Sequence, residues 1–311
     1  MSSMRKTVSI IIPVYNEVSN LGMMLEAIRL AIHSLPYDYD VIFVDDGSDD
    51  DTLGFIKQLA TVHPEVRFIS FSRNFGHQNA LKAGFDLSVA DAVISMDGDM
   101  QHPPAMLPEL LQHWEAGNDI VYTIRKDQQE LPMMKRKTSD FFYRILNRLS
   151  SIELEKGTAD FRLLDKRVVT VLKDIKEDDL FWRGLVKWLG FKQVSITYEP
   201  GQRVAGKSKY TYKKMMEFAL RGITSFSTKP LTIAIYLGFA SALISFFYIP
   251  YALISYFSGH VISGWASVIV TIAFFGGIQL MILGIIGMYL GKLFMQSKQR
   301  PHYIIRETNI R

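Results

Sequence analysis

Two carboxylates one residue apart, Asp97 and Asp99, end an apolar run that begins at Ala92. A short apolar run bounded by turn residues is typical of a buried strand, so both acids are predicted at the carboxyl end of a sheet, where open α/β folds bind ligands. An Asp-x-Asp pair offers hard oxygen ligands to a divalent cation, such as Mg²⁺ or Mn²⁺, that carries a diphosphate. Short acidic loops also serve as helix N-caps and solvated turns, so the pair alone does not decide the function.

The charges of this chain of 311 residues are unevenly distributed. Its net charge is +4, but no Lys, Arg, Asp or Glu occurs from Leu231 to Gly291. The chain is therefore predicted to divide near Lys229 into a catalytic part and a membrane part. It has no cysteine, which excludes disulfides and thiolate chemistry. The first apolar run is too short for a signal peptide, so none is expected.

The part before the membrane segment alternates strand patterns with helix patterns. Strands are predicted at 8–13, 41–44, 66–71, 92–96 and 120–124, and helices at about 18–35, 52–62, 78–88 and 106–116. Repeated units of this kind predict an α/β fold with a mostly parallel, doubly wound, Rossmann-like sheet and helices on both faces. The polar loops after the second, third and fourth strands would share one edge of that sheet, which predicts the ligand crevice there.

Five segments resemble, in sequence and in order, the motifs of family 2 glycosyltransferases with the GT-A fold. They are Pro13–Glu17, Val44–Ser48, Arg73–Gly76, Met96–Gln101 and Arg203–Tyr210. More narrowly, the chain resembles polyprenyl-phosphate glycosyltransferases, especially the bactoprenol (undecaprenyl-phosphate) glucosyltransferases, and is related to dolichol-phosphate mannosyltransferases. The resemblance covers essentially the whole sequence, and it implies a GT-A domain over residues 1–210.

The resemblance implies a nucleotide-sugar donor at the predicted crevice. In that family the loop after the first strand and the aspartate after the second hold the nucleotide, so the donor-binding candidates are Pro13, Tyr15, Glu17 and Asp46. A carboxylate accepts hydrogen bonds from a uracil N–H or from ribose hydroxyls. Capping of the next helix is the alternative for Asp45 and Asp46, and both roles are expected, with Asp46 as the ligand.

The resemblance also implies a metal site. Asp97 and Gly98 match the positions that face the ribose and sugar of the donor, and Asp99 and Gln101 match the metal-binding positions. Gly98 stands where many relatives have Ala, which is a conservative difference. An amide oxygen completes a hard oxygen shell without adding negative charge. The implied Mg²⁺ or Mn²⁺ would neutralise the diphosphate and stabilise the departing nucleoside diphosphate.

The implied acceptor is a lipid phosphate, which changes the need for a general base. Its second pKa is about 6, so it is largely ionised at neutral pH and can attack directly. The enzyme must supply cationic groups that position this dianion, and the resemblance implies Arg125, Arg136 and Ser139 for that role. The lysines nearby, at 126, 135 and 137, are equally well explained as a solvated basic helix face.

Three basic residues, Arg203, Lys207 and Lys209, lie in a glycine-bearing loop that could close over the diphosphate. Attraction to anionic lipid just before the membrane is the alternative explanation, and the two are compatible.

Asp160 matches the position of the usual base in this fold. Because a phosphate acceptor makes a base dispensable, its role stays open. It could orient Arg125 or Arg136, contact the sugar, or form a structural salt bridge with Arg162 or Lys166.

The last third of the chain is predicted to attach to a membrane. Residues 211–229 have the pattern of a basic amphipathic helix that lies on the bilayer surface. Within 230–291, two stretches at about 231–257 and 266–290 each exceed the ~20 apolar residues that span a bilayer, which predicts a transmembrane hairpin. Lys and Arg flank its outer ends but not its connector, so both ends, including a basic tail at 292–311, are predicted to be cytoplasmic. The expected location is the inner (plasma) membrane.

Two smaller patterns remain open. Gly287-x-x-x-Gly291 offers a close helix contact, either within the hairpin or between the subunits of a homo-oligomer. Trp182 and Trp188, on a helix predicted at 180–189, are expected in the core or at the membrane interface rather than as sugar platforms.

Other classes of protein explain fewer of these residues. A processive polysaccharide synthase would carry a Gln-x-x-Arg-Trp motif and more membrane helices. A haloacid-dehalogenase-like phosphatase leaves Asp46, Gln101 and Arg203 unexplained, and a silent scaffold or sensor would lose the metal site. The resemblance therefore implies an inverting transferase that moves a hexose to undecaprenyl phosphate for the modification of a surface polymer. UDP-glucose is the expected donor, while N-acetylglucosamine, mannose and aminoarabinose donors, which serve close relatives, stay open. No nucleic-acid partner is expected.

Overall fold

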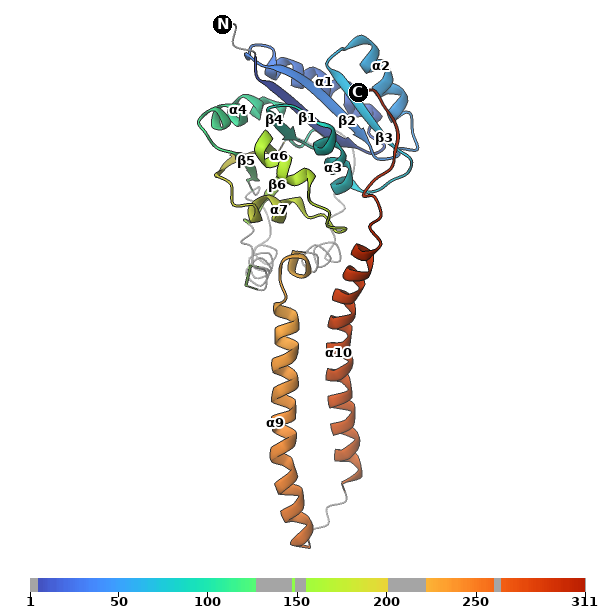
Figure 1. The fold of residues 1–311 in the computed structure, drawn as a ribbon, viewed down its shortest axis with the longest axis vertical. Helices are drawn as coiled ribbons and strands as arrows, with labels where there is room; N and C mark the ends of the chain where they lie inside the picture. The colour runs from blue at the N-terminus through green and yellow to red at the C-terminus, as the bar shows by residue number, and fades with distance from the viewer. Residues whose placement is uncertain (1–4, 127–146, 149–154, 201–221, 260–263, 311) are drawn as a thin grey trace.

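The computed structural model describes residues 5–126, 147–148, 155–200, 222–259 and 264–310. Strands and helices alternate through the first part of the chain, as predicted (Figure 1). The strands are β1 (Thr7–Val14), β2 (Asp38–Asp45), β3 (Val66–Phe71), β4 (Ala92–Ser95), β5 (Ile120–Arg125), β6 (Thr158–Asp165), β7 (Gln193–Tyr198) and β8 (Ile305–Thr308). The helices are α1 (Val18–Ile32), α2 (Thr52–Val62), α3 (His77–Leu87), α4 (Leu107–Glu115), α6 (Lys166–Lys173), α7 (Trp182–Trp188), α9 (Lys229–Phe257) and α10 (Trp265–Ser297).

The eight strands of the described residues form one sheet in the order β7-β5-β6-β4-β1-β2-β3-β8. Parallel pairs join β1 to β2 and β4, β2 to β3, and β5 to β7. β6 is antiparallel to both β4 and β5, and β8 is antiparallel to β3. The prediction of an α/β fold with a mostly parallel sheet is confirmed, with two antiparallel strands added.

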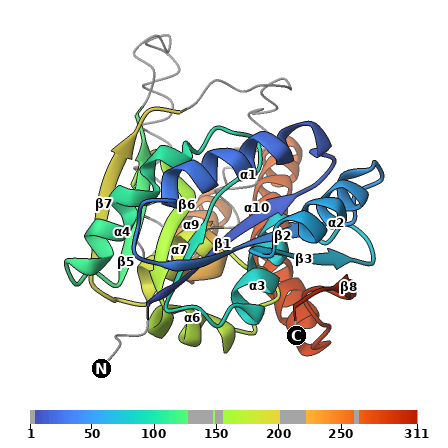
Figure 2. The ribbon, with the colours of Figure 1, turned by 90° about the horizontal axis from the view of Figure 1, so that it is seen from above.

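The central strand β1 is buried along all but its first residue. A parallel strand with helices on both faces is apolar along its whole length, because neither face meets water. Its alternate side chains enter two hydrophobic clusters: Ile10 and Ile12 pack with Met24 of α1, whereas Ile11 packs with Ala80 of α3. Figure 2 shows α1 and α3 on opposite faces of the sheet.

The predicted elements of the first 125 residues occur with small changes at their ends. β2 begins at Asp38 rather than Val41, because it pairs with β1 from Thr7 onward. The first helix ends at Ile32 rather than Leu35. Three strands were not predicted at all: β6, β7 and β8.

Two long helices, α9 and α10, extend away from the α/β part and contact each other (Figure 1). Among the described residues, one segment, Val268–Ser297, is long and apolar enough to cross a membrane, and the apolar stretch Lys229–Ile244 of α9 is shorter. Helices therefore occur where two spans were predicted, while the transmembrane hairpin itself stays a prediction. Of the helix predicted at 211–229, residues 222–229 are described: 222–226 are helical, whereas Ser227 and Thr228 are not, so the predicted helix does not continue to Lys229, where α9 begins.

The chain after α10 returns to the sheet. The basic tail predicted for residues 292–311 instead contains the last turns of α10 and the edge strand β8, which lies beside β3 (Figures 1 and 2). The last residues of the chain are therefore part of the α/β fold.

A glycine in α3 is required by its close approach to β1. A Cβ on Gly84 would lie 2.4 Å from Cγ2 of Ile11, whereas a Cβ on Gly22 of α1 would meet Phe55 at an ordinary 3.7 Å. We expect Gly84→Ala to lower the free energy of unfolding by about 2 kcal/mol through overpacking. Gly22→Ala should raise it by up to about 1 kcal/mol, because alanine favours the helix. Apparent melting temperatures of the purified variants that shift in the same direction would contradict this difference.

Candidate active site

The polar loops that follow β1, β2 and β4 lie at one edge of the sheet. These three strands are parallel neighbours, so their carboxyl ends point the same way. Backbone bonds extend the pairing just past the strands, from Asp46 N–H to Val14 O at 2.9 Å and from Met96 N–H to Ile11 O at 3.0 Å. A Cβ on Gly98 would lie 3.0 Å from Val14 Cγ1, so the Asp97–Gln101 loop packs directly on the end of β1. β3 is parallel to β2 as well, so the shared edge predicted for the loops after the second, third and fourth strands is confirmed.

Asp46 holds the loop that follows β3. Its carboxylate is buried and accepts the backbone N–H groups of Phe75 at 2.6 Å and Gly76 at 2.9 Å. Burial raises the pKa of Asp46, and these two N–H groups oppose that rise. A Cβ on Gly47, which has φ +69°, would lie 2.4 Å from the carbonyl carbon of Arg73, so only glycine allows the two loops to come this close.

The predicted capping of α2 by Asp45 and Asp46 is wrong. Asp45 Oδ1 accepts the N–H of Ser48 at 3.0 Å and its Oδ2 accepts the hydroxyl of Ser70 at 2.8 Å. The N–H of Thr52, at the start of α2, donates instead to Asp50 Oδ1 at 3.0 Å. Asp45 therefore connects its own loop to strand β3, and Asp46 connects that loop to the loop after β3. A nucleotide role for Asp46 stays a prediction.

The loop after β1 is cross-linked to the loop after β2. Pro13 is buried within β1, while Tyr15 is exposed and its hydroxyl donates to Asp49 Oδ2 at 3.1 Å. Asn16 adopts a left-handed φ of 56° and accepts the N–H of Asp49 at 2.9 Å. The N–H of Glu17 donates to Thr52 at 3.1 Å. The donor-binding candidates of this loop therefore stand at the same edge as Asp97.

Two histidines that the sequence analysis did not select hold Asp97. His77 Nε2 lies 2.9 Å from Asp97 Oδ1. His102 Nδ1 accepts the N–H of Asp97 at 2.9 Å, so its proton is on Nε2, which faces Asp97 Oδ2 at 3.6 Å. Burial acts to raise the pKa of Asp97, but His102, the bond from His77 and the charge of Arg183 outweigh it, and the pKa is lowered. Asp97 is therefore an oriented, ionised carboxylate.

The predicted metal ligands lie next to each other in the loop. The N–H of Gln101 donates to Asp99 Oδ1 at 3.1 Å, and Met100 between them has a left-handed φ of 64°. Arg125, at the end of β5, donates from Nη1 to Gln101 Oε1 at 3.3 Å. The described residues contain no group of three or more His, Cys, Asp or Glu side chains that could hold a metal alone. One carboxylate and one amide oxygen fit a hard cation whose other ligands come from a diphosphate and water.

Asp160 is buried on β6 between two arginines. Arg162 Nη2 lies 3.0 Å from its Oδ1, and Arg183 Nη2 lies 3.0 Å from its Oδ2. Burial acts to raise the pKa of Asp160, but the two guanidinium charges outweigh it and lower the pKa to about 2. Of the roles considered from the sequence, the structure contains the salt bridge to Arg162. Arg125 instead contacts Gln101.

The family follows from comparison with known proteins. The family model described as glycosyl transferase family 2 matches residues 9–172, which is more than half of the chain. The chain belongs to glycosyl transferase family 2. The matched region contains the Asp97–Gln101 loop, the loop of Asp46 and the strand of Asp160.

Relatives extend this similarity over the whole length. The bactoprenol glucosyl transferase of Shigella phage SfV is 39% identical over 300 residues, which cover 96% of this chain and 98% of that protein. The prophage bactoprenol glucosyl transferase homolog of Escherichia coli (strain K12) is 37% identical over 302 residues, which cover 97% and 99%. An uncharacterized glycosyltransferase of Bacillus subtilis (strain 168) is 38% identical over 301 residues, which cover 96% and 93%.

A solved structure shows the same fold. The mannosyltransferase PcManGT from Pyrobaculum calidifontis, in complex with GDP-Man and Mn²⁺, superposes with a TM-score of 0.50 at 15% identity. The similarity covers 72% of this chain and 64% of that one. The α/β part of this family 2 glycosyltransferase is therefore a GT-A fold with a mixed, mostly parallel sheet.

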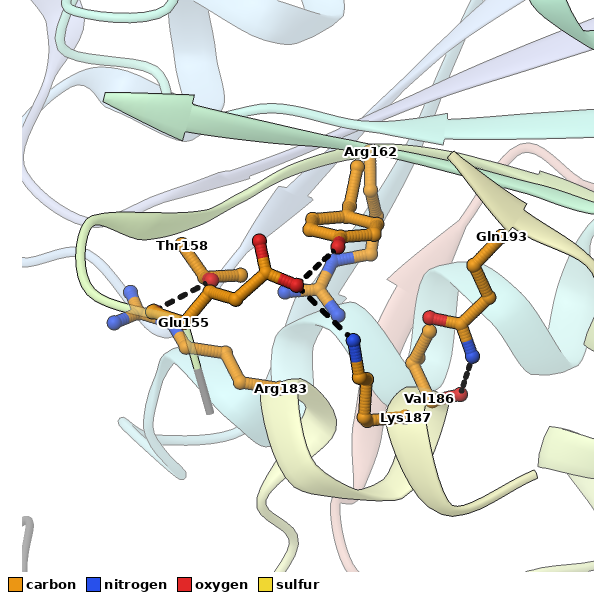
Figure 3. Close-up of a pocket in the computed structure, with 8 residues that line it drawn as sticks. Glu155, Thr158, Arg162, Arg183, Val186, Lys187 and Gln193 are labelled. Carbon is orange, nitrogen blue, oxygen red and sulfur yellow. Dashed lines mark hydrogen bonds and ion pairs between the residues drawn. The ribbon is translucent and has the colours of Figure 1, made fainter. Parts of the chain in front are cut away.

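A polar pocket of this family 2 glycosyltransferase lies between β5, β6 and α7 (Figure 3). Figure 3 shows Glu155 in its centre, where Oε1 accepts the hydroxyl of Tyr122 at 2.6 Å and lies 3.1 Å from Lys187 Nζ. Arg162 and Arg183 also line this pocket, so it adjoins the ion cluster of Asp160. The cations of α7 are therefore already paired with carboxylates of β6 and of the loop before it.

Four predicted site residues lie outside the described residues: Arg136, Ser139, Arg203 and Lys209. The sequence analysis missed three that the structure brings to the site: His77, His102 and Arg183. A signal existed for the histidines, because one directly follows the Arg73–Gly76 motif and the other directly follows Gln101. Trp182 and Trp188 were expected in the core or at the membrane interface; Trp182 lies in the core, and Trp188 is exposed.

The ion cluster gives a stability prediction. Asp160→Asn would leave Arg162, whose side chain is 3% exposed, without its carboxylate. Removing one partner of a buried pair is strongly destabilising, so we expect a loss of about 3 kcal/mol in the free energy of unfolding at pH 7. The control is Asp38→Asn, in an exposed pair with Arg5, which should change it by less than about 1 kcal/mol.

The same variant has a defined pH dependence. The folded-state pKa of Asp160, about 2, is below its ordinary value, so its stabilisation is complete above about pH 4 and is lost as the pH falls toward 2. The difference in melting temperature between wild type and Asp160→Asn should shrink over that interval. A difference that stays constant from pH 7 to pH 3 would contradict the arrangement.

Proposed function

We propose that this family 2 glycosyltransferase transfers a hexose, with UDP-glucose as donor, to undecaprenyl phosphate with inversion at the anomeric carbon. The observation that supports this best is the contact between Gln101 and Arg125. It places a cation suited to an acceptor phosphate beside the residues suited to a donor diphosphate. The full-length similarity to proteins named bactoprenol glucosyl transferases supports the acceptor class.

The donor is proposed to bind across the ends of β1, β2 and β4. Tyr15, Glu17 and Asp46 would hold the nucleotide there, and Asp97 would accept hydrogen bonds from the ribose or sugar. The cross-links between these loops support the proposal because they fix the edge before a ligand arrives, which lowers the ordering cost of binding. Arg203 and Lys209, from the loop at 203–210, are proposed to contact the diphosphate.

Asp99 and Gln101 are proposed to hold Mg²⁺ or Mn²⁺. Once bound, the ion would neutralise the diphosphate and stabilise the charge of the leaving nucleoside diphosphate. The residues of the chain supply the orientation: the backbone N–H of Gln101 holds the Asp99 carboxylate, and Arg125 holds the amide oxygen of Gln101.

The acceptor phosphate is proposed to bind Arg125, with Arg136 and Ser139. One of its oxygens would form the new bond to the anomeric carbon, while the bond from that carbon to the diphosphate breaks and its electron pair leaves with the nucleoside diphosphate. Direct displacement inverts the configuration. The phosphate is already ionised, so no residue has to remove a proton. Asp160 is proposed to orient Arg183 rather than to act as a base, because its pKa is lowered to about 2.

The two long helices are proposed to cross the inner membrane as a hairpin, with the catalytic domain in the cytoplasm. α10 contains one candidate span and exposes large apolar side chains, among them Leu280 and Leu283. α9 does the same at residues such as Phe239 and Phe247. Exposed apolar surface of this extent requires a partner, and a bilayer supplies it. The amphipathic helix at 211–229 and a homo-oligomer remain proposals.

Transfer into lipid tests the function. Purified protein in detergent, with undecaprenyl phosphate and Mg²⁺ or Mn²⁺, should move radiolabel from UDP-glucose, and not from GDP-mannose, into extractable lipid. EDTA or Asp99→Ala should lower the rate at least ~100-fold, because a ligand to a catalytic metal is lost. Asp38→Ala, in an exposed surface pair, is the matched control and should retain the wild-type rate. Absence of lipid labelling with every donor and either metal would refute the proposal.

Adjacent cations test the acceptor site. Arg125→Ala should lower kcat/KM for the lipid acceptor by on the order of 10- to 100-fold, as expected for the loss of a hydrogen bond to a charged group, with the donor KM unchanged. Lys126→Ala, which removes an exposed partner of Glu199, should change it less than about 2-fold. Equal effects of the two variants would assign both residues to a general basic surface instead.

A further inference from the structure

The chain after α10 is built into the catalytic domain by strand pairing. β8 adds to the edge of β3 with Ser70 opposite Glu307 and Ile69 opposite Thr308. The N–H of Phe68 donates to Asn309 Oδ1 at 2.7 Å, and its carbonyl accepts the hydroxyl of Thr308 at 2.7 Å. An otherwise open sheet edge is thereby covered.

Side chains of this segment reach two helices of the catalytic domain. The ring of Tyr303 stacks on Phe71 with centroids 5.2 Å apart, and its hydroxyl donates to Asp86 Oδ2 of α3 at 2.9 Å. Burial and the charge of Asp86 raise the pKa of Tyr303, so its hydroxyl stays a donor. Glu307 lies 2.7 Å from Lys57 Nζ of α2. We call residues 302–310 the carboxyl-terminal clamp.

The end of α10 contacts the catalytic domain directly. At about 1.5 Å per residue its 33 residues are about 50 Å long, which exceeds a hydrocarbon thickness of about 30 Å, and its last turns are the part that contacts the domain. There Gln296 donates to Lys176 O at 2.7 Å and accepts the N–H of Asp178 at 2.7 Å. Lys292 Nζ lies 3.2 Å from Asp179. These contacts tie α10 to the loop between α6 and α7.

A separate junction joins the start of α9 to the same domain. The ring of Phe226 packs on Phe181, and a Cβ on Gly184 would lie 2.4 Å from that ring, so α7 and residue 226 are in close contact. Tyr289 of α10 donates to Ser227 O at 2.6 Å. Within the described residues, the domain is thus attached at two places, through α7 and through the clamp with the end of α10.

Attachment at two places restricts tilting, whereas one junction would act as a hinge. We infer that the carboxyl-terminal clamp is a positioning element that fixes the height and tilt of the catalytic edge over the bilayer, so that Arg125 meets an acceptor phosphate at headgroup depth. This inference rests on the proposed function. Small misplacement of reacting groups costs large factors in rate, which is why a fixed domain matters for an acceptor that cannot leave the membrane.

The clamp is tested by charge reversal and rescue. Glu307→Lys and Lys57→Glu each place like charges together, and the Lys57→Glu, Glu307→Lys double variant restores an opposite pair. Tyr303→Ala removes the stacked ring. The matched control is Arg306→Ala, at an exposed position of the same strand. Apparent melting temperatures and UDP binding of all variants are measured first to establish that the domain is folded.

The position of the catalytic domain over the bilayer is measured by a method that does not depend on enzyme activity. Because the chain has no cysteine, Val62→Cys, at an exposed site on α2, gives a single labelling position. The clamp variant combines Tyr303→Ala with Glu307→Lys. Energy transfer from the label to dye-bearing lipids in nanodiscs should change in this variant and should remain at the wild-type value in Arg306→Ala. Unchanged transfer in the clamp variant would overturn the inference, whatever the enzyme's activity.

Activity is then compared with two acceptors. We expect the clamp variant to lose at least 10-fold in rate with undecaprenyl phosphate in vesicles and less than 2-fold with a short, water-soluble prenyl phosphate. The charge-swap double variant should recover most of the rate that either single reversal loses. Equal losses with both acceptors would overturn the inference, because they indicate a purely structural role. Wild-type protein that labels neither acceptor refutes the proposed function instead, and the energy-transfer result still decides the clamp.

Discussion

The arrangement of the site depends on the buried carboxylate of Asp46. It accepts two backbone N–H groups from the loop that follows β3, and that loop leads directly into α3. The first residue of α3 is His77, which contacts Asp97 on the loop after β4. One buried acceptor thus connects the ends of three strands. Without it, two backbone N–H groups would lose their partner and the position of His77 would no longer be determined.

The acids at this edge remain charged because each is compensated. Asp97, which is partly exposed, is held by two histidines and buried Asp160 by two arginines, and these partners lower the pKa of each carboxyl. The two acids differ in whether a ligand can reach them. Asp97 belongs to the loop of Asp99 and Gln101 and can serve a ligand there, whereas Asp160 is enclosed and fixes β6 to α7. A carboxylate that loses its proton near pH 2 is a poor base at neutral pH.

The sequence predicted the elements whose pattern is local and missed those that depend on distant partners. The apolar runs of β1 to β5 and the polar residues at their ends are visible without a structure, so the shared edge could be predicted. β6 carries Asp160 and Arg162 inward, which removes the apolar alternation by which a strand is recognised. β8 has four residues and becomes a strand only because β3 offers it an edge. The contact of His77 likewise requires the packing of α3 on β1 and β2, and that of His102 requires the folded loop after β4.

The antiparallel strand β6 explains how the residues proposed for donor and acceptor come to one place. It lies between β4 and β5 and runs against both, so its first residues lie at the edge where those strands end. Gly157, with φ +82°, turns the chain there, and its carbonyl accepts the N–H of Arg125 at 2.9 Å. A Cβ on Gly157 would lie 2.9 Å from the Arg125 carbonyl oxygen, so glycine is needed for this approach. A purely parallel sheet would place the start of β6 at the opposite edge, far from Gln101 and Arg125.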